Sequence, residues 1–566
     1  MKKLLASVLV ILMAVLLVAP AFAENITPHV ITITNSDTSV RHTYEAYQVF
    51  MGRLDATESE ITNIEWGYGV DGDALLAELQ TIEDYEDCDS AYDVAQVIKD
   101  FADNSAKLDE FASIVGKHLS NTSNTSVYSS NTNAYHISVT GDGYYFIKDR
   151  NASVTDPGES YSKYMLNVVK NVTIEAKDDR LVPDKKIVNR DSSLTPSNAA
   201  AIGETILFQI RIPVPKMDGY KAYTFTMNDT LSAGLCDPEV VSVTVGLNTL
   251  TEDEGYTVDI EENQDGTTSL TVDFINMIQY KGTSGYVVVT YEATVDEDAV
   301  IGDEGNPNTV DFTYSNNPST TSEGVPGETP PDGGTTGTTP ESETITYVTA
   351  ITVEKVDGAD NTKKLADATF QLEGDALQTV ITTGVRYEAA PYTAQQGETI
   401  QAGTYYMLNN GTFTDIAPTA TNSSHYASTT QTYVPVKYTS ATHSGANVEY
   451  TATTGQAGIA GFSGLNAGTY TLTETLAPDG YNLLDSPINF TITWDATNGF
   501  AITSQNGTFV DNGDGTFSIT IANYGGTPLP STGGIGTTIF YIVGAVLVIG
   551  SGIVIVATKR AGKKEN

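Results

Sequence analysis

Two ionisable side chains stand on apolar strand faces, where an unpaired charge is costly. Period-two alternation places Lys355 on the same strand face as Ile351 and Val353, and Glu474 on the same face as Leu472. Burial favours the neutral forms, lowering a lysine pKa toward about 5–6 and raising a glutamate pKa toward about 8–9. A neutral amine can attack a carboxamide, and a protonated carboxyl can polarise its carbonyl and pass a proton to the leaving ammonia. These residue types therefore permit nucleophilic chemistry, although a buried ion pair would use the same ones.

The N-terminus has the pattern of a secretory signal. Lys2 and Lys3 precede an apolar run over residues 4–18, and Ala21-Phe22-Ala23 gives a small-x-small cleavage site. We therefore predict a signal peptide over residues 1–23 and a secreted mature chain that begins at Glu24.

The C-terminus has three parts in a fixed order. Leu529-Pro530-Ser531-Thr532-Gly533 comes first, an apolar stretch over about 538–557 follows, and the basic residues Lys559, Arg560, Lys563 and Lys564 come last. About 20 apolar residues are enough to cross a bilayer, and a basic tail is typical of a cytoplasmic stop. The order resembles the sorting signal of Gram-positive surface proteins. The resemblance implies that a sortase cleaves between Thr532 and Gly533, passes the Thr532 carboxyl to an amine, and discards a transient transmembrane span.

The composition argues against several classes of protein. Among 566 residues, 29 Lys and Arg against 71 Asp and Glu give a net charge of −42, which is wrong for a nucleic-acid-binding surface. Six His and two Cys offer little for a zinc site or a disulfide framework, so we expect no metal and no cofactor. We interpret Cys88 and Cys236 as buried or free, with an interdomain disulfide left open. No Ser-His-Asp order or phosphate loop suggests an enzyme.

The apolar patterning predicts a mainly β chain with several domains. Helical spacing over 73–79 and 91–119 indicates a helix-decorated (α+β) first domain, and short alternating runs indicate β-sandwiches after it. The predicted parts are an N-terminal domain over 24–177, a middle sandwich over 178–317, a Pro-, Gly- and Thr-rich linker over 318–343, a C-terminal β domain over 344–526 with an insertion at roughly 376–450, and the sorting signal over 527–566.

The last domain carries a specific set of phrases. They are Val353-Glu354-Lys355-Val356-Asp357, Leu365-Ala366-Asp367-Ala368-Thr369-Phe370, Gly468-Thr469-Tyr470-Thr471-Leu472-Thr473-Glu474 and Ala477-Pro478-Asp479-Gly480-Tyr481. Together they resemble the collagen-adhesin B-type domains of Gram-positive pilins. The resemblance implies an Ig-like sandwich in which Lys355 bonds covalently to Asn523 while Glu474 assists, by intramolecular chemistry without turnover.

The middle domain resembles the second domain of backbone pilins. The matching phrases are Pro183-Asp184-Lys185-Lys186-Ile187-Val188, Phe225-Thr226-Met227-Asn228-Asp229-Thr230-Leu231 and Asn306-Pro307-Asn308-Thr309-Val310. The resemblance implies a bond between Lys186 and Asn308, with Asp229 assisting. Lys186 shares a strand face with Val188, which favours it over Lys185. Lys185 and Asn306 remain alternatives.

Backbone pilins also carry an acceptor lysine between their first two domains. In this chain the corresponding segment ends in Val172-Thr173-Ile174-Glu175-Ala176-Lys177, where Glu175-Ala176 stands in place of the usual Tyr-Pro. The resemblance implies that Lys177 accepts the Thr532 carboxyl of the next subunit, with Lys170 as the alternative.

Taken together, the resemblances imply the shaft-forming major pilin of a sortase-assembled, wall-anchored pilus that serves adhesion. The implied partners are sortase, further copies of the chain, ancillary pilins, peptidoglycan and surface ligands of host or neighbouring cells. A single-molecule wall-anchored adhesin and an ancillary pilin are the alternatives.

Overall fold

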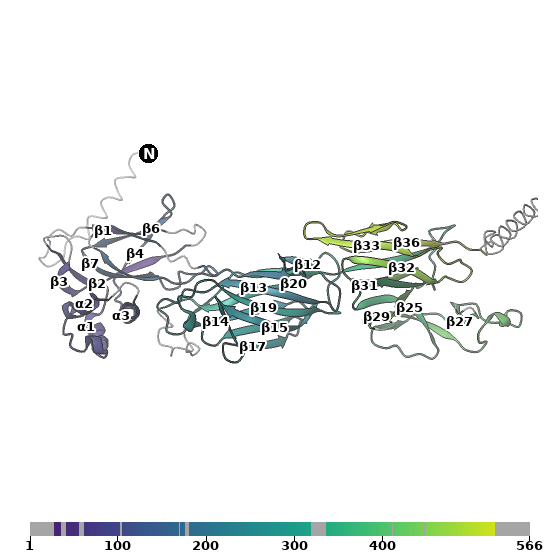
Figure 1. Ribbon diagram of the computed structural model, residues 1–566, viewed down its shortest axis with the longest axis horizontal. Helices are drawn as coiled ribbons and strands as arrows, with labels where there is room; N and C mark the ends of the chain where they lie inside the picture. The colour runs from purple at the N-terminus through teal and green to yellow at the C-terminus, as the bar shows by residue number, and fades with distance from the viewer. Residues whose placement is uncertain are drawn as a thin grey trace, which may run out of the picture. The chain divides into compact units, whose positions relative to one another are not determined.

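The computed structural model describes residues 28–34, 41–55, 61–101, 105–168, 170–175, 180–318, 335–409, 411, 413–445 and 448–526. The chain divides into two compact units at Val348 and Thr349. The first unit holds a helix-bearing N-terminal domain and a middle β-sandwich, and the second holds the C-terminal β domain (Figure 1). The mainly β, sandwich-based fold class predicted from the sequence is confirmed.

In its described residues, the N-terminal domain contains two sheets and three α-helices. The first sheet has the order β5-β6-β1-β9, and the second has the order β3-β2-β7-β8 with β4 beside β2. The bounds are β1 Pro28–Thr34, β2 Tyr44–Leu54, β3 Ile61–Trp66, α1 Gly72–Leu79, α2 Ala91–Ile98, α3 Ala106–Lys117, β4 Asn124–Thr125, β5 Val127–Ser129, β6 Ala134–Thr140, β7 Gly143–Asp149, β8 Lys163–Val168 and β9 Val172–Glu175.

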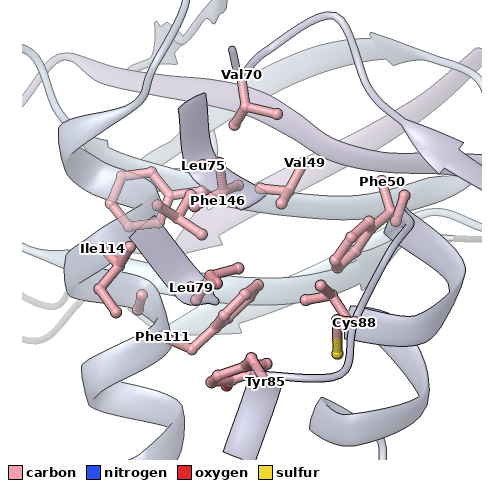
Figure 2. Close-up of a cluster of buried hydrophobic side chains, with 14 of the residues drawn as sticks. Val49, Phe50, Val70, Leu75, Leu79, Tyr85, Cys88, Phe111, Ile114 and Phe146 are labelled. Atoms are coloured by element: carbon pink, nitrogen blue, oxygen red, sulfur yellow. The ribbon is translucent and has the colours of Figure 1, made fainter. Parts of the chain in front are cut away.

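The helices cover the second sheet through one apolar cluster (Figure 2). Phe111 of α3 and Leu75 of α1 pack with Val49 of β2 and Phe146 of β7, and all four are fully buried. The long helical pattern over 91–119 is divided, because Ser105 begins α3 as an N-cap that accepts a hydrogen bond from the Leu108 amide. The apolar spacing over 91–119 did not predict the break between α2 and α3.

The middle domain is a sandwich of two antiparallel-rich sheets. One has the order β11-β10-β13-β19-β15-β16, and the other has β12-β22-β20-β14-β18-β17 with β21 beside β20. The bounds are β10 Asp184–Val188, β11 Leu194–Thr195, β12 Ser197–Ala199, β13 Thr205–Pro213, β14 Phe225–Leu231, β15 Leu235–Val245, β16 Asn248–Thr249, β17 Tyr256–Glu262, β18 Thr268–Phe274, β19 Tyr286–Val295, β20 Asn306–Ser315, β21 Thr336–Thr338 and β22 Ser342–Tyr347.

The predicted boundary between the middle and last domains is wrong. Strands β21 and β22 pair antiparallel with β20, so they complete the middle sandwich. The sequence predicts these residues to belong to the linker and to the start of the last domain, because a short Thr-rich strand after a Pro-Gly segment carries no sign of its distant partner. The last domain begins at Thr349.

The C-terminal domain is a second sandwich. Its sheets have the orders β26-β29-β25-β31-β23-β36-β35 and β30-β24-β32-β33-β34, with a small β27-β28 pair. The bounds are β23 Thr349–Asp357, β24 Thr369–Gly374, β25 Val380–Ala389, β26 Glu398–Ile400, β27 Tyr406–Met407, β28 Phe413–Thr414, β29 Tyr433–Thr442, β30 Tyr450–Thr453, β31 Ile459–Leu465, β32 Gly468–Leu476, β33 Ile488–Asp495, β34 Gly499–Ser504, β35 Phe509–Asp511 and β36 Phe517–Asn523. The predicted insertion contributes β25 and β29 to the main sheet.

Candidate cross-link sites

In the middle domain, a lysine, an asparagine and an aspartate meet between the two sheets. Lys185 Nζ of β10 lies 2.5 Å from Asn308 Oδ1 of β20, and 2.7 and 2.6 Å from the two carboxylate oxygens of Asp229 on β14. All three side chains are at most 1% exposed. The lysine comes from one sheet and its two partners from neighbouring strands of the other, so the cluster spans the sandwich.

The prediction that Lys186 is the buried lysine is wrong. Lys186 points outward, with a partly exposed side chain whose ammonium pairs with Asp184 at 2.6 Å. Lys185 shares the buried face with Ile187, whereas Val188 lies on the outer face with Lys186. Each lysine has one apolar neighbour two residues away, and the opposing sheet decides which face becomes the core.

The alternative asparagine has a structural role. Asn306 Oδ1 accepts a hydrogen bond from the Val300 amide, and its Nδ2 donates to the carbonyls of Val300 and Thr346. These contacts satisfy the buried amide where the chain turns into β20. Asn308 is therefore the residue placed against the lysine, as predicted.

A tyrosine that the sequence analysis missed completes the middle cluster. The Tyr291 hydroxyl of β19 donates to Asp229 Oδ1 at 3.0 Å and accepts from Asn308 Nδ2 at 2.6 Å. The alternation of β19 could have marked Tyr291 as inward-facing, since Val287 and Val289 share its face. Its polar partners lie on other strands and are visible only in the fold.

Burial shifts both ionisable groups of the middle cluster toward their neutral forms. Loss of water lowers the pKa of Lys185 to about 8, against the opposing attraction of Asp229. Loss of water likewise raises the pKa of Asp229, although Lys185 and the Tyr291 hydroxyl oppose the shift. Moving one proton from the ammonium to the carboxylate would leave a nucleophilic amine and a carboxylic acid beside one amide.

The C-terminal domain brings together the three residues predicted from its sequence. Lys355 Nζ of β23 lies 2.5 Å from Asn523 Oδ1 of β36 and 3.4 Å from Glu474 Oε1 of β32. Asn523 Nδ2 donates to Glu474 Oε1 at 2.8 Å, and the Leu484 amide donates to Glu474 Oε2 at 2.7 Å. Glu474 therefore faces both the amine and the amide nitrogen, with its second oxygen held by the backbone.

The burial of Lys355 and Glu474 predicted from strand alternation is confirmed. Lys355 is fully buried beside Ile351 and Val353, and Glu474 is 6% exposed beside Leu472. Burial lowers the pKa of Lys355 to about 8, although the Glu474 carboxylate opposes the shift. The amine is thus easier to deprotonate than one in water.

Several predicted residues lie outside the described parts of the chain. These are the signal peptide, the predicted acceptor Lys177, the sorting motif (Leu529, Pro530, Ser531, Thr532 and Gly533) and the apolar stretch over 538–557. The alternative acceptor Lys170 is described and exposed. In the described residues, no helix is long and apolar enough to cross a membrane.

The interpretation of the two cysteines is confirmed. Cys88 and Cys236 are free thiols, the first buried and the second partly buried. Residues 511–515 form the turn of the β35–β36 hairpin, with the Asn512 amide bonded to the Thr516 carbonyl. In the part of the chain that the structure describes, no group of three or more His, Cys, Asp or Glu could hold a metal ion.

Comparison with known families agrees with this architecture. Residues 202–318 match the family described as Gram-positive pilin backbone subunit 2, Cna-B-like domain, and residues 433–508 match the prealbumin-like fold domain SpaA. The chain is related to Gram-positive backbone pilins. The first match contains Asp229 and Asn308 of the middle cluster, and the second contains Glu474 of the C-terminal cluster.

Individual pilins show a similar relationship. The trypsin-resistant surface T6 protein of Streptococcus pyogenes serotype M6 is 29% identical over 290 residues, and the match covers 48% of each protein, about half the length of this relative. The solved T6 backbone pilin structure has a TM-score of 0.49 and 14% identity, covering 88% of this chain and 99% of that one. The major pilin SpaD of Corynebacterium diphtheriae has a TM-score of 0.45 and 16% identity, covering 88% and 98%.

Proposed function

We propose that this protein is the shaft subunit of a covalently polymerised, wall-anchored pilus, and that each of its two sandwiches is closed by an internal Lys–Asn amide bond. The observation that carries the proposal is the pair of buried lysine–asparagine–carboxylate clusters, each on strands of a pilin-type sandwich. The bonds are Lys185–Asn308 in the middle domain and Lys355–Asn523 in the C-terminal domain. The chain is a structural subunit, and each bond forms once.

The same chemistry applies to both clusters. The neutral lysine Nζ attacks the asparagine Cγ, a new Cγ–Nζ bond forms, and the Cγ–Nδ2 bond breaks. The amide nitrogen leaves as ammonia after receiving a proton through the nearby carboxyl group, which is Asp229 in one domain and Glu474 in the other. No oxidant or cofactor is needed. The sandwich holds the reacting groups in contact, which removes the entropic cost of bringing them together.

Assembly follows from the two predicted ends of the mature chain. A sortase would join the Thr532 carboxyl of one subunit to Lys177 of the next, and the last subunit would pass to peptidoglycan. Ancillary pilins and a surface ligand on host or neighbouring cells are further partners of such a fibre. A covalent chain also explains how so acidic a subunit can polymerise despite its electrostatic self-repulsion.

Intact mass of the mature chain (residues 24–532) tests the internal bonds. We expect the wild-type protein to be lighter than its sequence by two molecules of ammonia, and Asn308→Ala and Asn523→Ala each to be lighter by one. A wild-type mass equal to the sequence mass would overturn the cross-link proposal.

Polymer formation in a sortase-bearing Gram-positive host tests the assembly step. We expect Lys177→Ala to abolish the high-mass ladder on a denaturing gel, while the matched control Lys170→Ala retains it. The opposite result would make Lys170 the acceptor. Monomers attached to the wall in the wild type would instead identify a single-molecule adhesin, and incorporation into a ladder built by another subunit would identify an ancillary pilin.

A further inference from the structure

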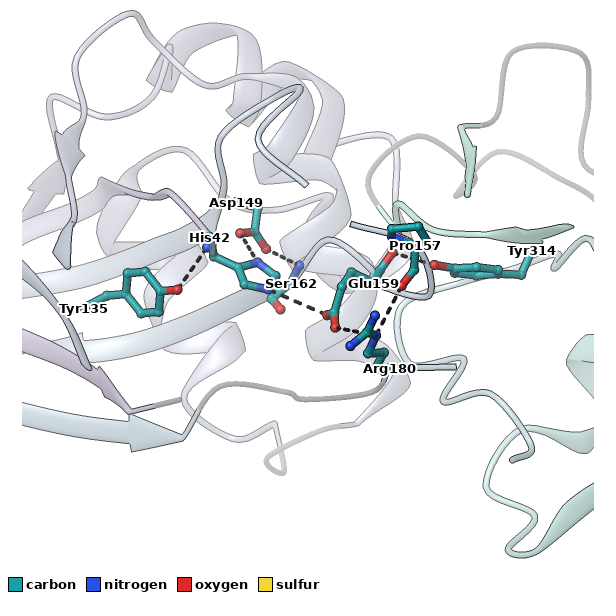
Figure 3. Close-up of polar contacts among 8 residues, drawn as sticks. All are labelled: His42, Tyr135, Asp149, Pro157, Glu159, Ser162, Arg180 and Tyr314. Carbon is teal, nitrogen blue, oxygen red and sulfur yellow. Dashed lines mark hydrogen bonds and ion pairs between the residues drawn. The ribbon is translucent and has the colours of Figure 1, made fainter. Parts of the chain in front are cut away.

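A cluster of four buried or partly buried charges lies where the N-terminal domain meets the middle domain, and it shares no residue with either cross-link cluster. Its members, called here the charge cluster, are His42, Asp149, Glu159 and Arg180. His42 Nδ1 lies 2.8 Å from Asp149 Oδ1, and His42 Nε2 lies 3.7 Å from Glu159 Oε2 (Figure 3). Arg180 Nε lies 3.9 Å from Glu159 Oε1. With the imidazole protonated, the two positive and two negative charges balance.

The segment 156–162, between β7 and β8, joins this charge cluster to the middle domain. The Gly158 amide donates to the Thr338 carbonyl of β21 at 2.8 Å, and the Tyr161 amide donates to the Asn316 carbonyl at 2.8 Å. The Tyr314 hydroxyl of β20 donates to the Glu159 carbonyl at 2.7 Å. Glu159 thus contacts the middle domain through its backbone and the N-terminal domain through its carboxylate.

The chain that leaves the N-terminal domain is fastened to the same segment. The Leu181 amide donates to the Gly158 carbonyl at 2.9 Å, and Arg180 Nε donates to the Pro157 carbonyl at 3.3 Å. Gly158 has a φ of +88°, and an added Cβ would lie 2.5 Å from the Leu181 carbonyl oxygen. The segment therefore fits closely between two other pieces of backbone, and only glycine suits that position.

We propose that segment 156–162 is a latch that docks the N-terminal domain on the middle domain, and that the charge cluster holds this latch closed. The four charges balance, so removing one leaves the cluster with an uncompensated net charge. The latch does not depend on how subunits are joined, and it determines whether the first two domains move as one body or as two.

The latch also has a predicted pH range. Burial alone would lower the pKa of His42, but its contacts with Asp149 and Glu159 outweigh burial and raise the pKa to about 10. The other groups that face His42 are the Tyr44 ring of β2, stacked at 5.5 Å, and the Tyr135 hydroxyl of β6, which accepts from the His42 amide. Arg180 acts on it through Glu159. The stabilisation that protonated His42 gives the latch should therefore be complete below about pH 6.5, decrease as the pH rises above that value, and be lost above pH 10.

Amide hydrogen exchange of the mature chain tests the latch, because the amides of Gly158, Tyr161 and Leu181 each donate across it. We expect Glu159→Gln to raise the exchange of these amides at least tenfold and to leave β13 and β19 of the middle core unchanged. The matched control is Glu78→Gln. Glu78 also bridges a histidine and a cation, His118 and Lys117, but lies within the N-terminal domain. We expect this control to leave the three amides as in the wild type.

Trypsin cleavage after Arg180, recognised by fragment mass, gives a second readout. Gly158→Ala removes no charge but cannot fit the latch, so it should be cleaved at least tenfold faster than the wild type. His42→Gln should raise amide exchange and trypsin cleavage as much as Glu159→Gln does. The double variant should raise them little more than either single variant. Wild-type exchange and cleavage in Glu159→Gln and Gly158→Ala would overturn the latch. Wild-type behaviour in Glu159→Gln alone would overturn the role of the charge cluster.

Discussion

Lys185 and Asn308 face each other across the two sheets of the middle sandwich, with Nζ and Oδ1 2.5 Å apart. The corresponding pair of the C-terminal domain, Lys355 and Asn523, lies instead on neighbouring parallel strands of one sheet. A bond in the first case would fasten sheet to sheet, and in the second it would fasten the first strand of the domain to the last. A lysine–asparagine pair thus occurs in two different geometries.

The adjacent lysines of β10 offer a sharp test of the middle cluster. Lys185→Ala should remove one ammonia loss from the intact mass and lower the free energy of unfolding by at least 3–5 kcal/mol, roughly the cost of leaving a buried charge partner behind. Loss of the covalent loop between Lys185 and Asn308 should lower the free energy of unfolding further, by as much as about 5 kcal/mol in the chain-entropy model. Lys186→Ala removes only a surface ion pair, worth less than about 1 kcal/mol.

Denaturant unfolding with mass measurement checks this prediction. If the mass deficit of one ammonia disappeared in Lys186→Ala and remained in Lys185→Ala, Lys186 would be the cross-linked lysine, as the sequence predicted.

The C-terminal cluster predicts a pH effect in a chain that cannot cross-link. Burial lowers the pKa of the uncross-linked Lys355 to about 8 from its ordinary 10.5, and we expect Asn523→Ala to keep this lowered pKa. Between these values the unfolded chain binds more protons than the folded one, so stability rises with pH. The lowered pKa of Lys355 reduces the free energy of unfolding by about 3 kcal/mol below pH 8, and this reduction disappears above pH 10.5.

Urea unfolding of Asn523→Ala at several pH values measures this rise. Lys355→Met in the same background lacks the titrating amine and should not show it. Equal pH slopes in the two variants would contradict a depressed lysine pKa.

The positions of the two bonds predict where the subunit can lengthen under tension. Residues 356–522 lie inside the Lys355–Asn523 loop and cannot extend. Residues 309–348, which include β21 and β22, follow Asn308 and lie outside both loops. The described part of this segment is held by side-chain packing and by hydrogen bonds worth about 1 kcal/mol each, with no covalent cross-link, so β22 should peel from β20 first.

Single-molecule pulling between Lys177→Cys and Thr532→Cys, with Cys88 and Cys236 replaced by Ala, measures this extension. We expect one step on the order of 100 Å from the peeled strands. Adding Asn308→Ala should lengthen the total by roughly 400 Å, because the 123-residue separation between Lys185 and Asn308 becomes extensible. A wild-type subunit that extends by several hundred ångströms would contradict the placement of the bonds.

Local patterning determined much of this protein. Period-two alternation put Lys355 and Glu474 on buried faces, and the phrases around them identified a pilin-type sandwich before any partner was visible. Short alternating runs indicated that the middle domain is a β-sandwich, since a half-buried strand needs little more than alternation to be recognised.

Tertiary structure decided what depends on distant partners. On β10, Lys185 pairs with Ile187 on one face and Lys186 with Val188 on the other, so alternation defines two equivalent faces and the opposing sheet chooses between them. Packing of distant segments also decided three other features: the contacts of Tyr291, the assignment of β22 to the middle sandwich, and the contact between His42 and Glu159. Each joins residues far apart in the chain, and such contacts arise only when whole sheets and domains pack together.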